Sequence, residues 1–168
     1  MAEHLVVMGV SGSGKTTVGR LLAARLDVAF ADADDFHPAR NVAKMRAGHP
    51  LTDADREPWL HAVAAWTAEY DHEGRPTVVA CSALKYAYRE VLRTAPGRVR
   101  FVHLAPAPAE IAVRVRERTG HFMPPELLAS QLADLQPLRP DEDGVTVESP
   151  EGLEETVDMV VEALEETG

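Results

Sequence analysis

The chain of 168 residues is 45% hydrophobic and 26% charged, which suits one globular domain with a buried core, and we expect residues 1–168 to form that single domain. Its 27 acidic residues outnumber its 17 lysines and arginines, for a formal charge of −10, which argues against binding to a nucleic-acid backbone along a basic surface. The single cysteine, Cys81, leaves no partner for an internal disulfide and too few thiolates for a metal cluster. No apolar run approaches the roughly 18 residues of a membrane span, and the sequence shows no signal-peptide features. We therefore expect a cytoplasmic protein without a membrane partner.

Short apolar segments of β-rich composition alternate along the chain with longer segments whose apolar residues recur every three or four positions. The expected strands are 4–10, 28–32, 77–82, 98–104 and 145–149. The expected helices are 15–26, 53–70, 83–94, 108–118, 124–135 and 153–164. This alternation predicts an α/β fold of right-handed βαβ units, in which a mostly parallel sheet is covered by helices on both faces.

Two polar segments interrupt this pattern, each between the end of a strand and the next framework helix. The first, about 37–58, is punctuated by prolines and a glycine, and the second, about 116–126, places cations before "GHFMPP". Open α/β folds bind ligands beside the carboxyl ends of the strands, where both segments are expected to lie. We therefore expect a substrate-binding flap and a mobile lid at these two places.

The segment "GVSGSGKT", from Gly9 to Thr16, matches the phosphate-loop pattern G-x-x-x-x-G-K-[ST] and lies between the first expected strand and helix. Its glycines allow consecutive backbone N–H groups to surround a phosphate at the positive end of a helix. Lys15 is expected to reach the phosphates of ATP, and the Thr16 hydroxyl to ligate Mg²⁺. No N-K-x-D guanine-reading motif is present, so GTP is not expected. The predicted nucleotide-binding residues are Gly9, Ser11, Gly12, Ser13, Gly14, Lys15, Thr16 and Thr17.

The second expected strand runs into "DADD", which concentrates carboxylates at its end. Alone, such a cluster is typical of a solvated turn, but beside a phosphate loop we interpret it as functional. If this strand lies next to the first one, Asp32 and Asp34 alternate along it and point the same way, near the γ-phosphate. Asp32 is then suited to hold Mg²⁺ through water, and Asp34 to orient an attacking hydroxyl and accept its proton.

Cations and polar groups follow in the flap and after the third strand, and they suit a small polyhydroxylated anion better than a flat base. We expect Lys85 and Arg89, four residues apart, to share one helix face. The side chains considered for this pocket are His37, Arg40, Asn41, Lys44, Arg56, Ser82, Lys85 and Arg89. We interpret Cys81, Trp59 and Trp66 as packing residues.

The segment "RVRERTGHF" places three arginines before the lid. A closing arginine commonly stabilises the charge of a transferring phosphoryl group and excludes water. Arg114 and Arg118 can share a helix face, whereas Arg116 should point elsewhere. The predicted catalytic residues are therefore Lys15, Asp34 and Arg118.

Four segments resemble the gluconokinases of the shikimate-kinase-like group of P-loop kinases, in order and along most of the chain. They are "MGVSGSGKTT", "DADDFHPARNVAKMRAGHPLTDADREPWL", "CSALKYAYR" and "RTGHFMPPELLASQLADLQPL". The resemblance implies a three-layer sandwich with a five-stranded parallel sheet, commonly a homodimer, that uses ATP and Mg²⁺ to phosphorylate D-gluconate at its 6-hydroxyl. It implies a nucleotide and lid role for Arg114 and Arg118. It assigns to the gluconate side Asp34, His37, Lys44, Arg56, Lys85 and Arg89.

Two other readings of the residues stay open at this point. The first is a kinase for another small acceptor, such as shikimate or a nucleoside monophosphate. The second, from a different class, is a regulatory protein that binds ATP without transferring phosphate. Assays with different acceptors test the first reading. An Asp34→Asn substitution tests the second, because a protein that transfers no phosphate should hardly respond to it.

Overall fold

The computed structural model describes residues 2–10, 13–105, 131–148 and 152–167. Its centre is a five-stranded sheet in which every pair of neighbouring strands is parallel, in the order β2-β3-β1-β4-β5. The strands are β1 (Glu3–Met8), β2 (Ala29–Asp32), β3 (Thr77–Ala80), β4 (Arg98–Leu104) and β5 (Gly144–Val147). The helices are α1 (Lys15–Leu26), α2 (Ala39–Arg46), α3 (Asp53–His72), α4 (Tyr86–Leu92) and α7 (Leu153–Thr167), with a short 3-10 turn, η1, over Ala33–Phe36.

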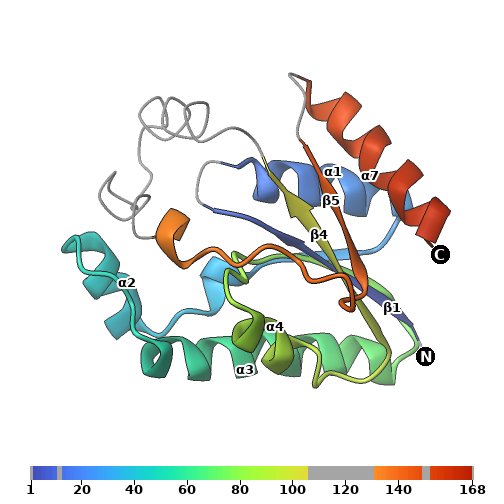
Figure 1. Ribbon diagram of the computed structural model, residues 1–168. Coiled ribbons are helices and arrows are strands. Elements are labelled where there is room, and N and C mark those ends of the chain that lie inside the picture. The colour runs from blue at the N-terminus through green and yellow to red at the C-terminus, as the bar shows by residue number, and fades with distance from the viewer. Residues whose placement is uncertain (1, 11–12, 106–130, 149–151, 168) are drawn as a thin grey trace.

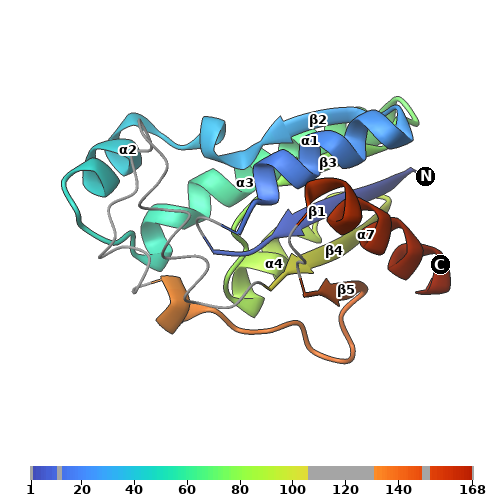
Figure 2. The same ribbon diagram turned by 90° about the horizontal axis from the view of Figure 1, so that it is seen from above.

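Helices cover both faces of the sheet, as the sequence predicts. Leu5 and Val7 of β1 pack towards α1 and α7, whereas Val6 and Met8 pack towards α3 and α4. The two layers lie on opposite sides of the sheet, and α2 lies at the end of the molecule remote from both termini (Figures 1 and 2). The predicted α/β architecture with a five-stranded parallel sheet is confirmed. None of the described helices is long and apolar enough to cross a lipid bilayer.

The strand order differs from one expectation: β2 does not lie beside β1, because β3 pairs with both of them. All four residues of β3 are buried, whereas all four residues of β2 are only half-buried. A strand covered on both faces by helices and on both sides by strands is mostly apolar. The largely apolar "TVVA" segment takes the inner position, and "AFAD", which ends in a carboxylate, takes the edge of the sheet.

The segment predicted as a flap contains more regular structure than its composition suggests. Residues 39–46 form α2, which ends before Gly48 in the left-handed region at φ 81°. Helix α3 then begins with a capping box, in which the Thr52 hydroxyl accepts from the Asp55 N–H and the Asp55 carboxylate accepts from the Thr52 N–H. The predicted helix 108–118 and the lid at 116–126 lie outside the described residues, as does most of the predicted helix 124–135.

Candidate active site

The phosphate loop follows β1 at the carboxyl edge of the sheet. A Cβ atom on Gly9, whose φ is 152°, would lie 2.8 Å from the Ser13 Oγ and 2.9 Å from the Leu104 carbonyl oxygen, so no larger residue fits. Gly14 caps the start of α1 in the left-handed region at φ 87°. The described part of the loop therefore has the tight backbone that presents N–H groups to an anion at a helix N-terminus.

Lys15 and Thr16 begin α1 directly behind this turn, and both are half-buried, whereas Thr17 is exposed. The Thr16 hydroxyl donates to the Asp32 Oδ2 over 3.0 Å. The carboxyl ends of parallel strands meet at one edge, so Asp32 reaches the loop although β3 separates its strand from β1. The remaining predicted nucleotide and lid residues, Ser11, Gly12, Arg114 and Arg118, lie outside the described residues.

Asp34 is held by Asp32 through the backbone. The Asp34 N–H donates to the Asp32 Oδ1 over 2.9 Å, which caps η1. Asp34 therefore lies in a 3-10 turn and not in the strand, so the expected alternation of the two carboxylates along one strand is wrong. The turn still leaves the half-buried Asp34 side chain at the edge that carries the phosphate loop.

Cys81 is a fully buried thiol directly after β3. Burial raises the pKa of this thiol to about 12, and the charges of Asp34, Lys15 and Asp32 act on it as well. A thiol with so high a pKa is not a nucleophile at neutral pH. The interpretation of Cys81 as a buried packing residue is confirmed.

The oxygen groups of Thr16 and Asp32 fit a hard divalent cation. Mg²⁺ prefers oxygen ligands, keeps several waters and commonly binds to one or two carboxylates plus substrate phosphates. The described residues contain no cluster of three or more histidine, cysteine or acidic side chains that would hold a metal by itself. The donor set therefore suits an ion that arrives with a nucleotide.

His37 lies beside this turn, against the start of α3. Its ring stacks on Trp59 with the centroids 4.1 Å apart and the planes at 16°. The Trp59 indole donates to the Ala33 carbonyl oxygen over 2.6 Å, and the Asn41 Nδ2 lies 3.2 Å from the His37 Nδ1. Burial, assisted by the charge of Arg56, lowers the pKa of His37 to about 4, although Asp32 opposes this shift. His37 is therefore neutral at physiological pH.

Lys44 links α2 to the N-terminus of α3. Its Nζ lies 2.5 Å from the Asp55 Oδ2, and Asp55 also accepts from the Thr52 N–H. The hydrogen bond from Lys44, followed by that from Thr52, lowers the pKa of Asp55 to about 2. Asp55 is consequently a carboxylate at neutral pH, and it holds Lys44 in place.

Arg56 and Lys85 converge on one carboxylate from two different helices. The Asp53 Oδ1 accepts from the Tyr88 hydroxyl over 2.5 Å and lies 3.3 Å from the Lys85 Nζ and 3.9 Å from the Arg56 Nη1. Arg56 also donates to the Tyr88 hydroxyl oxygen over 2.8 Å. The Asp53 side chain is 69% exposed, so this cluster opens to solvent at the N-terminus of α3.

Arg89 does not share a face with Lys85, and this expectation is wrong. Lys85 is the N-cap of α4, with extended backbone angles, because Ala83 takes the left-handed conformation at φ 45° and delays the helix start. Arg89 is fully buried and forms a bidentate pair with Glu142, with N–O distances of 2.7 and 2.9 Å. It also donates to the Ala83 carbonyl oxygen over 2.9 Å. The structure thus places Arg89 behind the loop that carries Lys85.

Glu142 and Tyr88 are site residues that sequence reasoning missed. Burial alone would raise the pKa of Glu142, but hydrogen bonds from Arg89, from the Arg139 N–H and from Arg93 hold this pKa at about 2. In the sequence, Glu142 is one of several acids in "PDEDG", and Tyr88 occupies an ordinary apolar position of a helix. No local pattern distinguishes them, because their partners lie on other elements.

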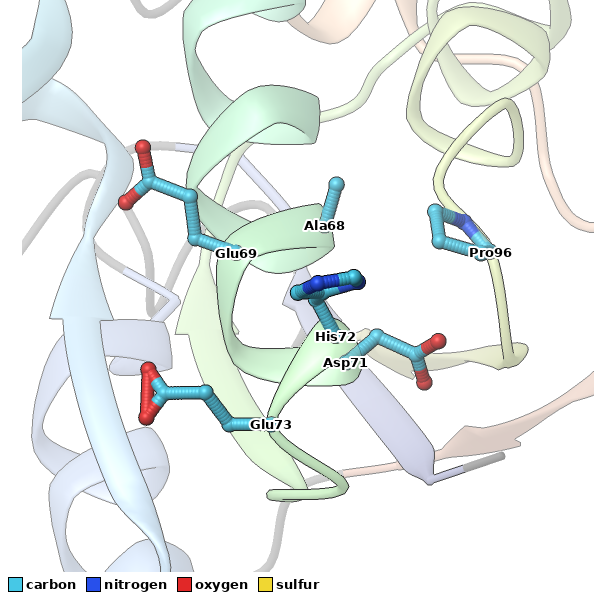
Figure 3. A pocket seen from close by; sticks show the side chains of 6 residues that line it. All are labelled: Ala68, Glu69, Asp71, His72, Glu73 and Pro96. Carbon is cyan, nitrogen blue, oxygen red and sulfur yellow. The ribbon is translucent and has the colours of Figure 1, made fainter.

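A hollow with an acidic lining lies near the amino ends of the strands, on the side away from the phosphate loop (Figure 3). It has a volume of about 800 Å³ at the C-terminal end of α3. Its lining residues are Ala68, Glu69, Asp71, His72, Glu73 and Pro96. A lining with three carboxylates disfavours the anionic ligands that a phosphate loop serves, so this hollow is not the candidate active site.

Comparison with known proteins finds similarity over nearly the whole chain. Residues 11–164 match the family model described as shikimate kinase. A gluconokinase of Gluconobacter oxydans is 48% identical over 162 residues, which cover 96% of this chain and 89% of the relative.

Solved structures agree with the sequence relatives. A sugar kinase from Janibacter sp. HTCC2649 has a TM-score of 0.93 and 45% identity, and the match covers 98% of this chain and 95% of that one. A gluconokinase from Sinorhizobium meliloti 1021 has a TM-score of 0.87 and 43% identity, with 98% and 92% covered.

Proposed function

This chain belongs to the gluconokinases of the shikimate kinase family, and from this premise we propose that it transfers the γ-phosphoryl group of ATP to the 6-hydroxyl of D-gluconate. The observation that carries the proposal is that the phosphate loop and the Asp32–Asp34 turn are joined by hydrogen bonds at the carboxyl ends of the strands. The cations Arg56 and Lys85 gather at the N-terminal ends of α3 and α4.

Lys15 and the loop amides would bind the phosphates, and Thr16 and Asp32 would hold Mg²⁺, which when bound neutralises charge on the phosphate oxygens. Lys15 is suited to this role because it follows Gly14 at the helix N-terminus. The hydrogen bond between Thr16 and Asp32 keeps the two oxygen groups together before nucleotide arrives. In this scheme the charged side chains reach their positions before the reaction and need little rearrangement.

Asp34 would orient the attacking hydroxyl and accept its proton. Its backbone is held by Asp32, while its half-buried side chain lies at the edge where the acceptor would meet the γ-phosphate. Phosphoryl transfer depends mainly on in-line positioning and on charge stabilisation. Asp34 therefore serves as base or orienter, with Arg118 and Arg114 proposed to complete the site from the lid.

The gluconate carboxylate would bind to the cations on the other side of the site. Arg56 and Lys85 already converge on a carboxylate, that of Asp53, so their geometry suits a second one. Lys44 and His37 would face the hydroxyl groups of the same ligand. We propose that Arg89 acts indirectly, because its guanidinium is occupied by Glu142 and by backbone carbonyls.

An ADP-release assay with ATP and Mg²⁺ tests the proposal, with D-gluconate, shikimate, a nucleoside monophosphate and no acceptor compared side by side. We expect turnover with gluconate far above the blank, at a higher kcat/KM than with the other acceptors. Preference for shikimate or a nucleotide would overturn the substrate. Absence of turnover with every acceptor would favour a regulatory ATP-binding protein.

We also propose a cytoplasmic homodimer. Large apolar side chains are exposed on α1 and α7, two helices that contact each other (Figure 2). They are Leu21, Leu26, Leu153 and Met159. Sedimentation equilibrium measures the oligomeric state, and a monomer at micromolar concentration would contradict the proposal.

A further inference from the structure

Asn41 is a polar side chain that is fully buried at the start of α2. Its Nδ2 lies 2.9 Å from the Asp55 carbonyl oxygen and 3.2 Å from the His37 Nδ1. Its Oδ1 is also buried and has no hydrogen-bond partner within the described part of the chain. A buried amide oxygen without a partner lowers stability. Packing alone therefore does not account for an asparagine at this position.

The orientation of the Asn41 amide follows from its two neighbours. A carbonyl oxygen only accepts hydrogen bonds, so the atom that faces the Asp55 carbonyl must be the amide nitrogen. The same NH₂ group faces the His37 Nδ1, and an amide nitrogen donates but does not accept. The His37 Nδ1 must therefore accept. A neutral imidazole carries one proton, which this contact places on Nε2.

The other groups around His37 keep its ring neutral and fix the orientation of the ring. Trp59 stacks on it, and the Trp59 indole is itself held by the Ala33 carbonyl oxygen. The charges that act on the ring are those of Arg56 and Asp32, with opposite effects. Among the described residues, no hydrogen-bond partner takes the Nε2, and His37 is only half-buried, which is compatible with a ligand at this donor.

We propose that Asn41 is a positioning residue that holds His37 in the Nε2–H tautomer, so that His37 donates a hydrogen bond to a hydroxyl oxygen of the acceptor. This inference rests on the proposed function, because it takes His37 to lie on the gluconate side. A neutral N–H group is suited to a hydroxyl, whereas the cations Arg56 and Lys85 are suited to the carboxylate. The two kinds of donor would together select a molecule that carries both groups.

Imidazole ¹⁵N NMR of histidine-labelled protein without ligand measures the tautomer directly, and the spectrum of His37→Gln assigns the His37 signals among the seven histidines. We expect a protonated Nε2 and an unprotonated Nδ1 in the wild-type protein at neutral pH. A protonated Nδ1, or an exchanging mixture of both tautomers, would overturn the inference. This measurement needs no change at position 41 and no activity.

Asn41→Asp tests the consequence for the substrate. The new carboxylate accepts from Nδ1–H, so the proton should move to Nδ1 or the ring should become charged. We expect the KM for gluconate to rise about tenfold, as for a lost hydrogen bond, and the KM for ATP to stay within about twofold. Ala43→Asp, which adds the same charge at an exposed position of α2, should leave the His37 spectrum and both KM values unchanged.

The outcomes separate this inference from the proposed function. A changed tautomer with an unchanged gluconate KM would overturn the positioning role of Asn41. A wild-type protein with the Nε2–H tautomer but no gluconate-dependent turnover would overturn the proposed function instead. If Asn41→Asp does not fold, Asn41→Ala serves the same purpose: it should give mixed tautomers and a similar rise in the gluconate KM.

Discussion

His4 lies near the amino ends of the strands and His37 lies beyond their carboxyl ends. The ring nitrogens of the two histidines have different partners. The His4 Nε2 is 2.9 Å from the Asp71 Oδ1 and its Nδ1 is 2.8 Å from the Thr77 Oγ1, so both ring nitrogens have protein partners. Within the part of the chain that the structure describes, only the Nδ1 of His37 has a hydrogen-bond partner, which is Asn41. His4 is 1% exposed, whereas His37 is half-buried. A histidine with both nitrogens satisfied ties elements together, and one with a nitrogen left over can meet a ligand.

Helix α3 runs from the region of His37 to the region of His4. Its two ends show the same contrast between a site for a ligand and a structural contact. Its N-terminal end carries Arg56 and Trp59, which face the candidate site, and its C-terminal end carries the acidic hollow and Asp71. Asp71 accepts from both His4 and the Ala2 N–H, which ties the amino edge of the sheet to α3. The carboxyl edge should therefore respond to substitution with changes in catalysis, and the amino edge with changes in stability.

The largest effect is expected at the carboxyl edge, for Asp34→Asn. Loss of the base or orienter should lower kcat on the order of 10²-fold or more, while the affinity for ATP stays nearly unchanged. Steady-state kinetics and nucleotide binding measure the two quantities. Asp35→Asn, a change to an exposed carboxylate in the same turn, is the matched control and should keep kcat. Full turnover in Asp34→Asn would remove Asp34 from the mechanism.

At the amino edge, His4→Ala should act on stability alone. The change removes a buried ring and leaves Thr77 and Asp71 without their partner, so the free energy of unfolding should fall by about 2 kcal/mol. Urea unfolding gives this value, and kcat and both KM values should match the wild type. His61→Ala, at an exposed position of α3, should change stability by less than about 0.5 kcal/mol. A large loss of kcat in a folded His4→Ala protein would contradict the division between the edges.

Lys85→Met tests whether the cations at the carboxyl edge serve the acceptor. Removal of one charge-assisted contact should raise the KM for gluconate about tenfold, with little change in the KM for ATP. Arg75→Met removes an exposed cation beyond the C-terminal end of α3 and is the control for net charge. Equal effects of the two variants would mean that Lys85 acts only through the overall charge.

The last prediction concerns the loss of stability in acid that follows from keeping His37 neutral. Its pKa in the folded protein is about 4, below the ordinary histidine value of 6.5, so between these pH values the unfolded chain binds a proton that the folded protein does not. Stability should therefore fall as the pH drops from about 6.5 to about 4, with no contribution from this group above that window. His37→Gln should make the pH dependence of the unfolding free energy shallower by up to about one proton. Identical slopes for both proteins would show that His37 is not held neutral.

Much of the framework could be predicted from local patterns. The bounds expected for α1 agree with the structure, because Gly14 begins this helix and the apolar spacing of its residues is regular. Helix α4 starts later than expected because Ala83 adopts a left-handed conformation that no sequence pattern indicates. Helix α2 could not be predicted from apolar spacing, because its buried residues are few and one of them is the polar Asn41.

The site was predictable in its residue types but not in its contacts. The sequence placed carboxylates after β2 and cations in the flap, yet it suggested a shared face for Lys85 and Arg89 that does not exist. Arg89 instead turns inward because Glu142, 53 residues away, supplies a buried carboxylate. Such long-range pairing leaves no periodic signal along the chain.

By itself, the sequence determined the phosphate loop, the alternation of strands and helices, the carboxylates after β2 and the family. These features depend on neighbouring residues, through backbone freedom, side-chain periodicity and charge. Only the tertiary structure decided that β3 lies between β2 and β1, that Thr16 meets Asp32, and that Asn41 faces both Asp55 and His37. The physical reason is that burial chooses the strand order, and the strand order and helix packing then choose which distant polar groups must satisfy one another.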